Sequence, residues 1–211
     1  MINDLSFDRL YELCRGQEFD KVDATNAADL YGRDNAIEVE TGILLYGLVR
    51  RIRPQLVVET GTMKGFSAAW IACGLADNFY LDTDKKPGHL VTVDTYHYDG
   101  VPEVLWKGIR VDHFVTHLIE FSQHAVIPGN DPIDMLFLDA DYGDRFPAEL
   151  RNFAERLAPT CMVMIHDTKM DPKARKAAQK VVHRLEREGL AVNRIGLNNM
   201  RGLEMIQRRG G

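Results

Sequence analysis

Acidic side chains recur at the ends of short apolar runs, where an α/β protein usually carries its chemistry. The first run, residues 56–58, leads to Glu59 and then to a turn framed by Gly61 and Gly65. Glycine lets the backbone turn sharply and approach a ligand closely. A carboxylate here disfavours a pyrophosphate, because that group binds backbone N–H groups. Glu59 instead suits a ligand with a cationic amine and hydrogen-bond donors, such as S-adenosylmethionine.

A second apolar run, residues 89–94, ends in Asp94. In nucleotide-binding sheets an acidic residue at this point binds the ribose hydroxyls. Asp94 lies further from the glycine turn than the usual distance of about 20 residues, because a polar loop intervenes. Two plainer interpretations remain open: a polar strand end at Asp94, and an ordinary strand-to-helix turn with incidental glycines at residues 59–65.

Composition limits the class of protein. The chain has 211 residues, of which 45% are hydrophobic and 27% charged, which is typical of a globular domain. We expect an N-terminal helical extension over residues 1–35 and one main domain over residues 36–211. The net charge of −5 gives no electrostatic argument for binding nucleic acid or an anionic membrane. Cys73 and Cys161 lie in apolar runs and are expected to be small core residues, so we expect a cytoplasmic protein. No apolar run approaches the roughly 18 residues of a membrane span.

Apolar patterning predicts the elements that position these acids. The runs 135–139 and 161–167 are apolar throughout and end in acid, which is typical of parallel strands covered on both faces. Strands are predicted at 56–58, 89–94, 114–121, 135–139 and 161–167, followed by a hairpin of 191–197 and 203–207. Helices are predicted at 7–15, 36–52, 66–75, 101–111, 145–157 and from 172 to about 188, with a polar loop at 77–86. The alternation predicts a doubly wound, Rossmann-like α/β sheet.

Five segments at successive positions along the predicted sheet resemble a known family. They read ETGTMKGFS, VTVD, FSQHAV, LFLDADYGDRF and MIHDT. Together they resemble the class I S-adenosylmethionine-dependent O-methyltransferases, near the catechol and caffeoyl-coenzyme A enzymes. The resemblance covers roughly residues 38–167. It implies a seven-stranded sheet in the order 3-2-1-4-5-7-6 whose last strand is antiparallel to the rest.

The resemblance also implies a cofactor site at the strand ends. It divides the site among the methionine part, the ribose and the adenine of S-adenosylmethionine. The implied residues are Glu59, Gly61, Thr62, Gly65 and Ser67 for the methionine part, Asp94 for the ribose, and Ser122 and Gln123 beside the adenine. Asp139 is also implied as a cofactor-binding residue.

A metal site is implied as well, made by Asp139, Asp167 and Thr168. Neighbouring strands lie about 4.8 Å apart, so carboxylates at their ends can converge on one cation. Oxygen ligands favour Mg²⁺ or a similar hard ion, which would lower the pKa of a substrate hydroxyl and orient its oxygen. The family usually has asparagine where this chain has Thr168, and a threonine hydroxyl is a weaker ligand.

The predicted site also needs a general base. The related enzymes carry a lysine just after the first metal-binding aspartate, and residues 140–144 contain none. His166 and Asp141 are the candidate catalytic residues, and the ordinary pKa of histidine suits a base at neutral pH. The alternative for His166 is a hydrogen-bonded histidine at a strand end without a catalytic role. The alternative for Asp141 is a carboxylate that caps a helix or lies in a loop.

These patterns predict an S-adenosylmethionine-dependent methyltransferase that acts on a hydroxyl of a small molecule, with or without Mg²⁺. The predicted partners are a small-molecule acceptor and a second copy of the chain, with no nucleic acid and no membrane. Two alternatives stay open: a cofactor-binding domain of the same fold without activity, and an NAD-dependent oxidoreductase. Asp94 fits the oxidoreductase, whereas Glu59 and the missing third glycine of the dinucleotide motif do not.

Overall fold

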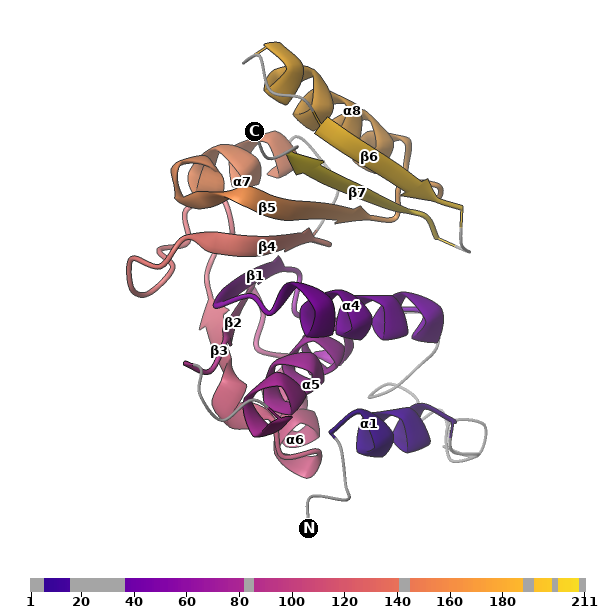
Figure 1. Ribbon diagram of the computed structural model, residues 1–211, viewed down its shortest axis with the longest axis vertical. Coiled ribbons are helices and arrows are strands. Elements are labelled where there is room, and N and C mark those ends of the chain that lie inside the picture. The colour runs from indigo at the N-terminus through magenta and orange to yellow at the C-terminus, as the bar shows by residue number, and fades with distance from the viewer. Residues whose placement is uncertain are drawn as a thin grey trace. The chain divides into compact units, whose positions relative to one another are not determined.

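The computed structural model describes residues 6–15, 37–81, 86–140, 145–187, 192–198 and 201–208. A seven-stranded sheet runs through them in the order β3-β2-β1-β4-β5-β7-β6 (Figure 1). The strands are β1 (Leu56–Thr60), β2 (His89–Asp94), β3 (Val115–Ile119), β4 (Ile133–Leu138), β5 (Leu157–His166), β6 (Val192–Leu197) and β7 (Leu203–Arg208). Strand β4 is parallel to β1 and β5, whereas β7 is antiparallel to β5 and β6. The predicted fold class and strand order are confirmed.

Six α-helices lie in the described ranges. They are α1 (Ser6–Arg15), α4 (Val39–Ile52), α5 (Phe66–Leu81), α6 (Val101–Gly108), α7 (Arg145–Phe153) and α8 (Pro172–Arg187). None of them is both long enough and apolar enough to cross a membrane. Strand β5 begins at Leu157, where the sequence pattern predicted the last residue of the preceding helix.

The chain forms two compact units. The first comprises Met1–Pro54, Thr62–Leu90 and Tyr96–His117, and the second comprises Gln55–Gly61, Val91–Thr95 and Leu118–Gly211. The second unit contains β1 and β4 to β7 together with α7 and α8 (Figure 1). Strand β1 is buried along its whole length and β4 along most of it, as expected for parallel strands that are covered on both faces.

In the first unit, helix α5 is longer than its sequence pattern suggests. The prediction of a polar loop from Asp77 onward was wrong, because the helix continues to Leu81. Asp77 is 1% exposed, and its carboxylate accepts the backbone N–H of Ser6 and the hydroxyl of Tyr46, both at 3.0 Å. Burial, together with the charge of Asp77, raises the pKa of Tyr46. A polar residue that suggested a loop therefore anchors the start of α1 instead.

Candidate active site

The carboxyl ends of β1, β2 and β4 meet at Gly61. The N–H of Gly61 donates to the carbonyl of Val93 at 2.9 Å, and the N–H of Asp139 donates to the carbonyl of Thr60 at 3.0 Å. Gly61 has φ +89°, and a Cβ there would lie 2.5 Å from the carbonyl oxygen of Asp139. Only glycine fits this conformation and this space, so the sequence of the turn dictates how closely these strand ends approach.

Glu59 and Asp94 lie at different depths of this edge. The Glu59 side chain is fully buried, and its Oε2 accepts the hydroxyl of Thr92 at 2.6 Å. Burying a carboxylate is costly unless hydrogen bonds or a cation compensate for the lost water. Asp94 ends β2 and is partly exposed, and its backbone carbonyl accepts the N–H of Glu120 at 2.8 Å.

Ser122 binds a buried carboxylate that the sequence analysis missed. Its hydroxyl donates to Glu149 of α7, which is 0% exposed and also accepts the hydroxyl of Thr60 at 3.5 Å. The sequence does contain a signal that Glu149 is buried, namely its helical spacing: it lies three residues after Phe146 and one turn before Phe153. Both phenylalanines are buried, so Glu149 lies on the same apolar face.

The segment after β3 presents a hydrogen-bond acceptor. The side-chain amide of Asn152 donates to the carbonyls of Ser122 at 3.1 Å and Ala125 at 2.9 Å, which fixes the segment in place. The Oε1 of Gln123 is buried, and no described group donates a hydrogen bond to it. A buried acceptor left in this state costs about 1–3 kcal/mol, which the N–H of a ligand would offset.

The glycine turn itself is tight. The N–H of Gly65 donates to the carbonyl of Thr62 at 2.8 Å, and Gly65 has φ +80°. The carbonyl of Gly65 accepts the indole N–H of Trp106 at 2.9 Å, and a Cβ on Gly65 would lie 2.9 Å from the Cβ of Pro102. Ser67 is buried in the first turn of α5. The strand, glycine turn and helix predicted from the sequence are therefore present.

Strand ends β4 and β5 bring three predicted site residues together. The Nδ1 of His166 lies 3.0 Å from Oδ1 of Asp139 and 3.2 Å from Oδ1 of Asp167. The side chains of His166 and Asp167 are 1% and 3% exposed, whereas that of Asp139 is 18% exposed. Asp139 is therefore the member of this group that a substrate can reach most easily. Asp141, the other candidate base, lies outside the described residues.

Arg201, a residue that no motif indicated, binds this group from the hairpin side. Its Nε and one terminal nitrogen each lie 2.6 Å from an oxygen of Asp167, a bidentate pair. The backbone N–H groups of Lys169 and Met170 donate to the carbonyl of Arg201 at 3.0 and 3.2 Å. The neighbouring Gly202 has φ +89°, and a Cβ there would overlap the backbone nitrogen of Lys169. The chain thus fixes the guanidinium on Asp167.

These contacts do not fit the predicted all-oxygen magnesium site. Two of the predicted ligands, Asp139 and Asp167, already contact a nitrogen, because the Nδ1 of His166 lies 3.0 and 3.2 Å from their Oδ1 atoms, whereas Mg²⁺ prefers to be surrounded by oxygen. The guanidinium of Arg201 already neutralises Asp167. The Thr168 hydroxyl lies 3.0 Å from where a Cβ on Gly202 would be, beside the hairpin turn.

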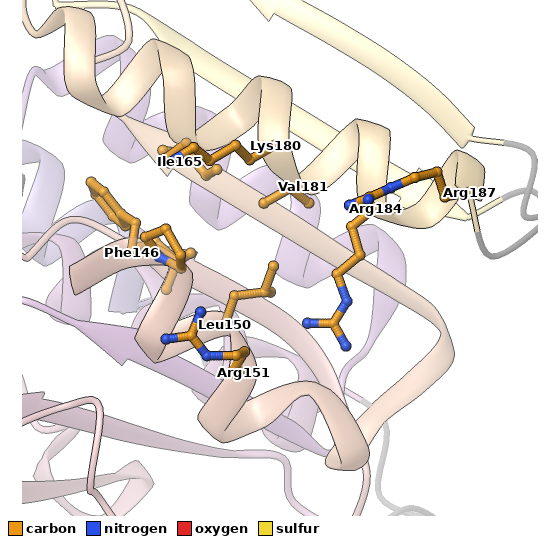
Figure 2. Close-up of a pocket in the computed structure, with 11 residues that line it drawn as sticks. Phe146, Leu150, Arg151, Ile165, Lys180, Val181, Arg184 and Arg187 are labelled. Atoms are coloured by element: carbon orange, nitrogen blue, oxygen red, sulfur yellow. The ribbon is translucent and has the colours of Figure 1, made fainter. Parts of the chain in front are cut away.

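A separate cavity of about 200 Å³ lies between α7 and α8 (Figure 2). Figure 2 shows apolar side chains such as Phe146, Leu150 and Val181 beside basic ones such as Arg151 and Arg184. Its described lining includes no predicted site residue, so we do not assign the candidate active site to it.

Residues 58–168, just over half of the chain, match the model of a family described as a methyltransferase domain. The chain belongs to this family. A search of curated proteins gives no match to this methyltransferase.

Solved structures support the same fold for this methyltransferase domain. The O-methyltransferase TomG from Streptomyces achromogenes, involved in tomaymycin synthesis and in complex with SAM, is 19% identical, with a TM-score of 0.69 over 99% of this chain and 91% of that chain. The O-methyltransferase from Bacillus cereus in complex with SAH is 16% identical, with a TM-score of 0.69 over 99% and 93%. Cofactor-bound Rv0187 from MTB is 20% identical, with a TM-score of 0.67 over 100% of both chains.

The predicted resemblance is confirmed by the family match. The family match and the fold of these neighbours also bear out the predicted enzyme class, an S-adenosylmethionine-dependent methyltransferase. They favour this class over the NAD-dependent oxidoreductase.

Proposed function

We propose that this methyltransferase transfers the methyl group of S-adenosylmethionine to a hydroxyl of a small molecule. The observation that carries the proposal is a set of hydrogen-bond acceptors at the carboxyl edge of the sheet. Glu59 is a fully buried carboxylate, Asp94 is a partly exposed one, and Gln123 has a buried Oε1 to which no described group donates. The cofactor offers matching donors: a cationic amine, two ribose hydroxyls and an adenine amino group.

Each acceptor has a proposed role. Glu59 would bind the amine, Asp94 the ribose hydroxyls and Gln123 the adenine amino group, with Ser122 beside it. Thr62, Gly65 and Ser67 would bind the methionine part through the turn after β1. When bound, S-adenosylmethionine supplies a methyl group on a sulfonium. The chain contributes orientation and the exclusion of water.

The acceptor hydroxyl would meet Asp139. The side chain of Asp139 is 18% exposed, and its Oδ1 lies 3.0 Å from the Nδ1 of His166. The hydroxyl proton would pass to the carboxylate of Asp139, while the bound cofactor would supply the methyl group by cleavage of its sulfur–methyl bond and leave as S-adenosylhomocysteine. His166, which is 1% exposed, orients Asp139 and stabilises its charge. The predicted role of Asp141 as a second base remains a prediction.

We propose that transfer proceeds without a divalent metal at Asp139 and Asp167. Arg201 places a permanent positive charge on Asp167, with two nitrogen–oxygen distances of 2.6 Å. Guanidinium remains charged at every pH that the protein experiences. The chain therefore provides its own positive charge beside this carboxylate.

Radiolabelled S-adenosylmethionine tests the proposal on a panel of phenols, catechols and sugars. We expect label in at least one acceptor, with the same rate in the presence and absence of excess EDTA. Asp139→Asn should reduce kcat at least a hundredfold while S-adenosylhomocysteine still binds. Asp112→Asn, which changes a partly exposed acid, is the matched control.

Other outcomes would contradict particular parts. A rate abolished by EDTA and restored by Mg²⁺ would refute the metal-free mechanism. Cofactor binding without transfer to any acceptor would favour a cofactor-binding domain that lacks activity. A thermal shift with NAD but not with S-adenosylhomocysteine would favour the oxidoreductase. A homodimer and a cytoplasmic location remain predictions.

A further inference from the structure

A second cluster of potential ligands lies within the first unit, formed by His97, Glu103 and His117. The Nδ1 of His117 lies 2.6 Å and the Nε2 of His97 lies 3.7 Å from the same oxygen, Oε1 of Glu103. One ligand atom from each residue lies within 4.8 Å of the other two. Three separate elements contribute: the segment after β2, the first turn of α6, and β3.

The backbone brings His97 to this position by an unusual turn. Tyr98, Asp99 and Gly100 have consecutive positive φ values of 50°, 52° and 78°. Left-handed conformations are unfavourable for non-glycine residues, so the rest of the structure must stabilise the turn. The rings of His97 and His117 stack at a centroid distance of 5.9 Å and an interplanar angle of 15°.

The ring of His117 is held by packing. Trp106 contacts it edge-on at a centroid distance of 5.7 Å, and the indole N–H of Trp106 donates to the carbonyl of Gly65. The His117 side chain is 6% exposed. One side of the cluster is therefore fixed, whereas the His97 side chain is 57% exposed and can adjust.

The cluster is not fully satisfied by its own hydrogen bonds. Oε2 of Glu103 and Nε2 of His117 are both buried, and neither has a hydrogen-bond partner among the described residues. Burial would raise the pKa of Glu103, but the hydrogen bond from His117 and the charges of both histidines outweigh this effect, and the net result is a lowered pKa. Oε2 of Glu103 is therefore a buried acceptor that a bound ion could satisfy.

We propose that His97, Glu103 and His117 bind one divalent transition-metal ion, with Zn²⁺ as the preferred ion. Two imidazoles and a carboxylate form a ligand set that zinc sites use, and nitrogen ligands disfavour Mg²⁺ and Ca²⁺. Ligand atoms about 2.1 Å from a tetrahedral ion lie about 3.4 Å apart. The observed separations of 2.6 and 3.7 Å fall on either side of this value.

Such an ion would fasten the segment that carries His97 to α6 and β3. Oε2 of Glu103 would gain a partner if the carboxylate binds with both oxygens. The site is distinct from the group formed by Asp139, His166 and Asp167, so its test does not depend on methyl transfer.

Calorimetric titration of Zn²⁺ into chelator-treated protein tests the proposal. We expect one equivalent to bind, and a rise in Tm of about 5–10 °C at a hundredfold excess over Kd. His97→Ala should weaken binding at least tenfold without affecting folding, because its side chain is largely exposed. His113→Ala is the matched control, since His113 is an exposed histidine 3.9 Å from Asp112.

The variant Asp139→Asn shows which of the two clusters binds Zn²⁺. It should leave the zinc affinity unchanged if the ion binds at His97, Glu103 and His117. The proposal is overturned if the wild-type protein binds no Zn²⁺ below millimolar concentration, or if His97→Ala and His117→Ala bind it as tightly as the wild type. Loss of zinc binding in Asp139→Asn alone would place the ion in the other cluster.

Discussion

Replacing Arg201 with methionine should destabilise the protein strongly. The guanidinium makes two contacts of 2.6 Å with Asp167, whose side chain is 3% exposed. Arg201→Met keeps much of the apolar stem but removes both hydrogen bonds and the positive charge. Asp167 then remains as a buried carboxylate without its strongest partner.

The magnitude follows from the burial of the two partners. Removing one member of a fully buried ion pair costs about 3–5 kcal/mol. The Arg201 side chain is 23% exposed, so water can partly compensate, and we expect the lower end, about 3 kcal/mol. For a chain of this length that corresponds to a decrease in Tm of roughly 6–12 °C.

Urea unfolding of Arg201→Met, Asp167→Asn and the double variant measures the effect as a double-mutant cycle. The double variant should be more stable than Arg201→Met, because it no longer buries an uncompensated charge. A loss below about 0.5 kcal/mol in Arg201→Met, or strictly additive single effects, would refute the reasoning.

Four further changes have defined outcomes. Gly61→Ala should cost about 3 kcal/mol in urea unfolding, because a Cβ would lie 2.5 Å from a carbonyl oxygen at φ +89°; an unchanged midpoint contradicts this. Asp77→Ala should cost about 2–4 kcal/mol by the same measurement, since it removes the acceptor for a buried N–H and a hydroxyl, and an effect no larger than that of a surface variant argues against it. The pKa of Glu103 is lower in the folded state than its usual value of 4.5, so its ionised form contributes to stability above that pH and this contribution is lost as the pH falls below it. Glu103→Gln should therefore flatten the decline in the free energy of unfolding as the pH falls below about 4.5, and parallel declines in variant and wild type would disprove the linkage. Burial raises the pKa of Cys161 to about 12, so a thiol reagent at about pH 8 should modify it only after unfolding, and modification of the folded protein would refute this.

The positions of the strands could be predicted because the strands carry their own signals, whereas their order in the sheet came from the family resemblance. Residues 135–138 are apolar without interruption, and both β4 and β5 end directly before or at a polar site residue. Parallel strands place their carboxyl ends at one edge, so Glu59, Asp94 and Asp139 could be assigned to that edge from the sequence. The structure confirms this placement through the hydrogen bonds around Gly61.

The partners of these residues could not be predicted, because they are distant in sequence and carry no local pattern. Arg201 lies 34 positions from Asp167, in a turn whose docking depends on Gly202. Glu149 lies 27 positions from Ser122, and its spacing from Phe146 and Phe153 indicates only that it is buried, not which residue it binds. Local patterning also ended α5 too early at Asp77, because burial of its carboxylate depends on α1. Tertiary partners decide the roles of polar residues.

Calorimetric titration with S-adenosylhomocysteine tests the central claim most directly. The account predicts one site with a Kd in the range of about 1–100 μM, weakened at least tenfold in Asp94→Ala because a charged acceptor for hydroxyl groups is lost. Asp112→Asn should bind like the wild type. No heat of binding at millimolar ligand, or equal affinity in Asp94→Ala, would contradict the proposed cofactor site.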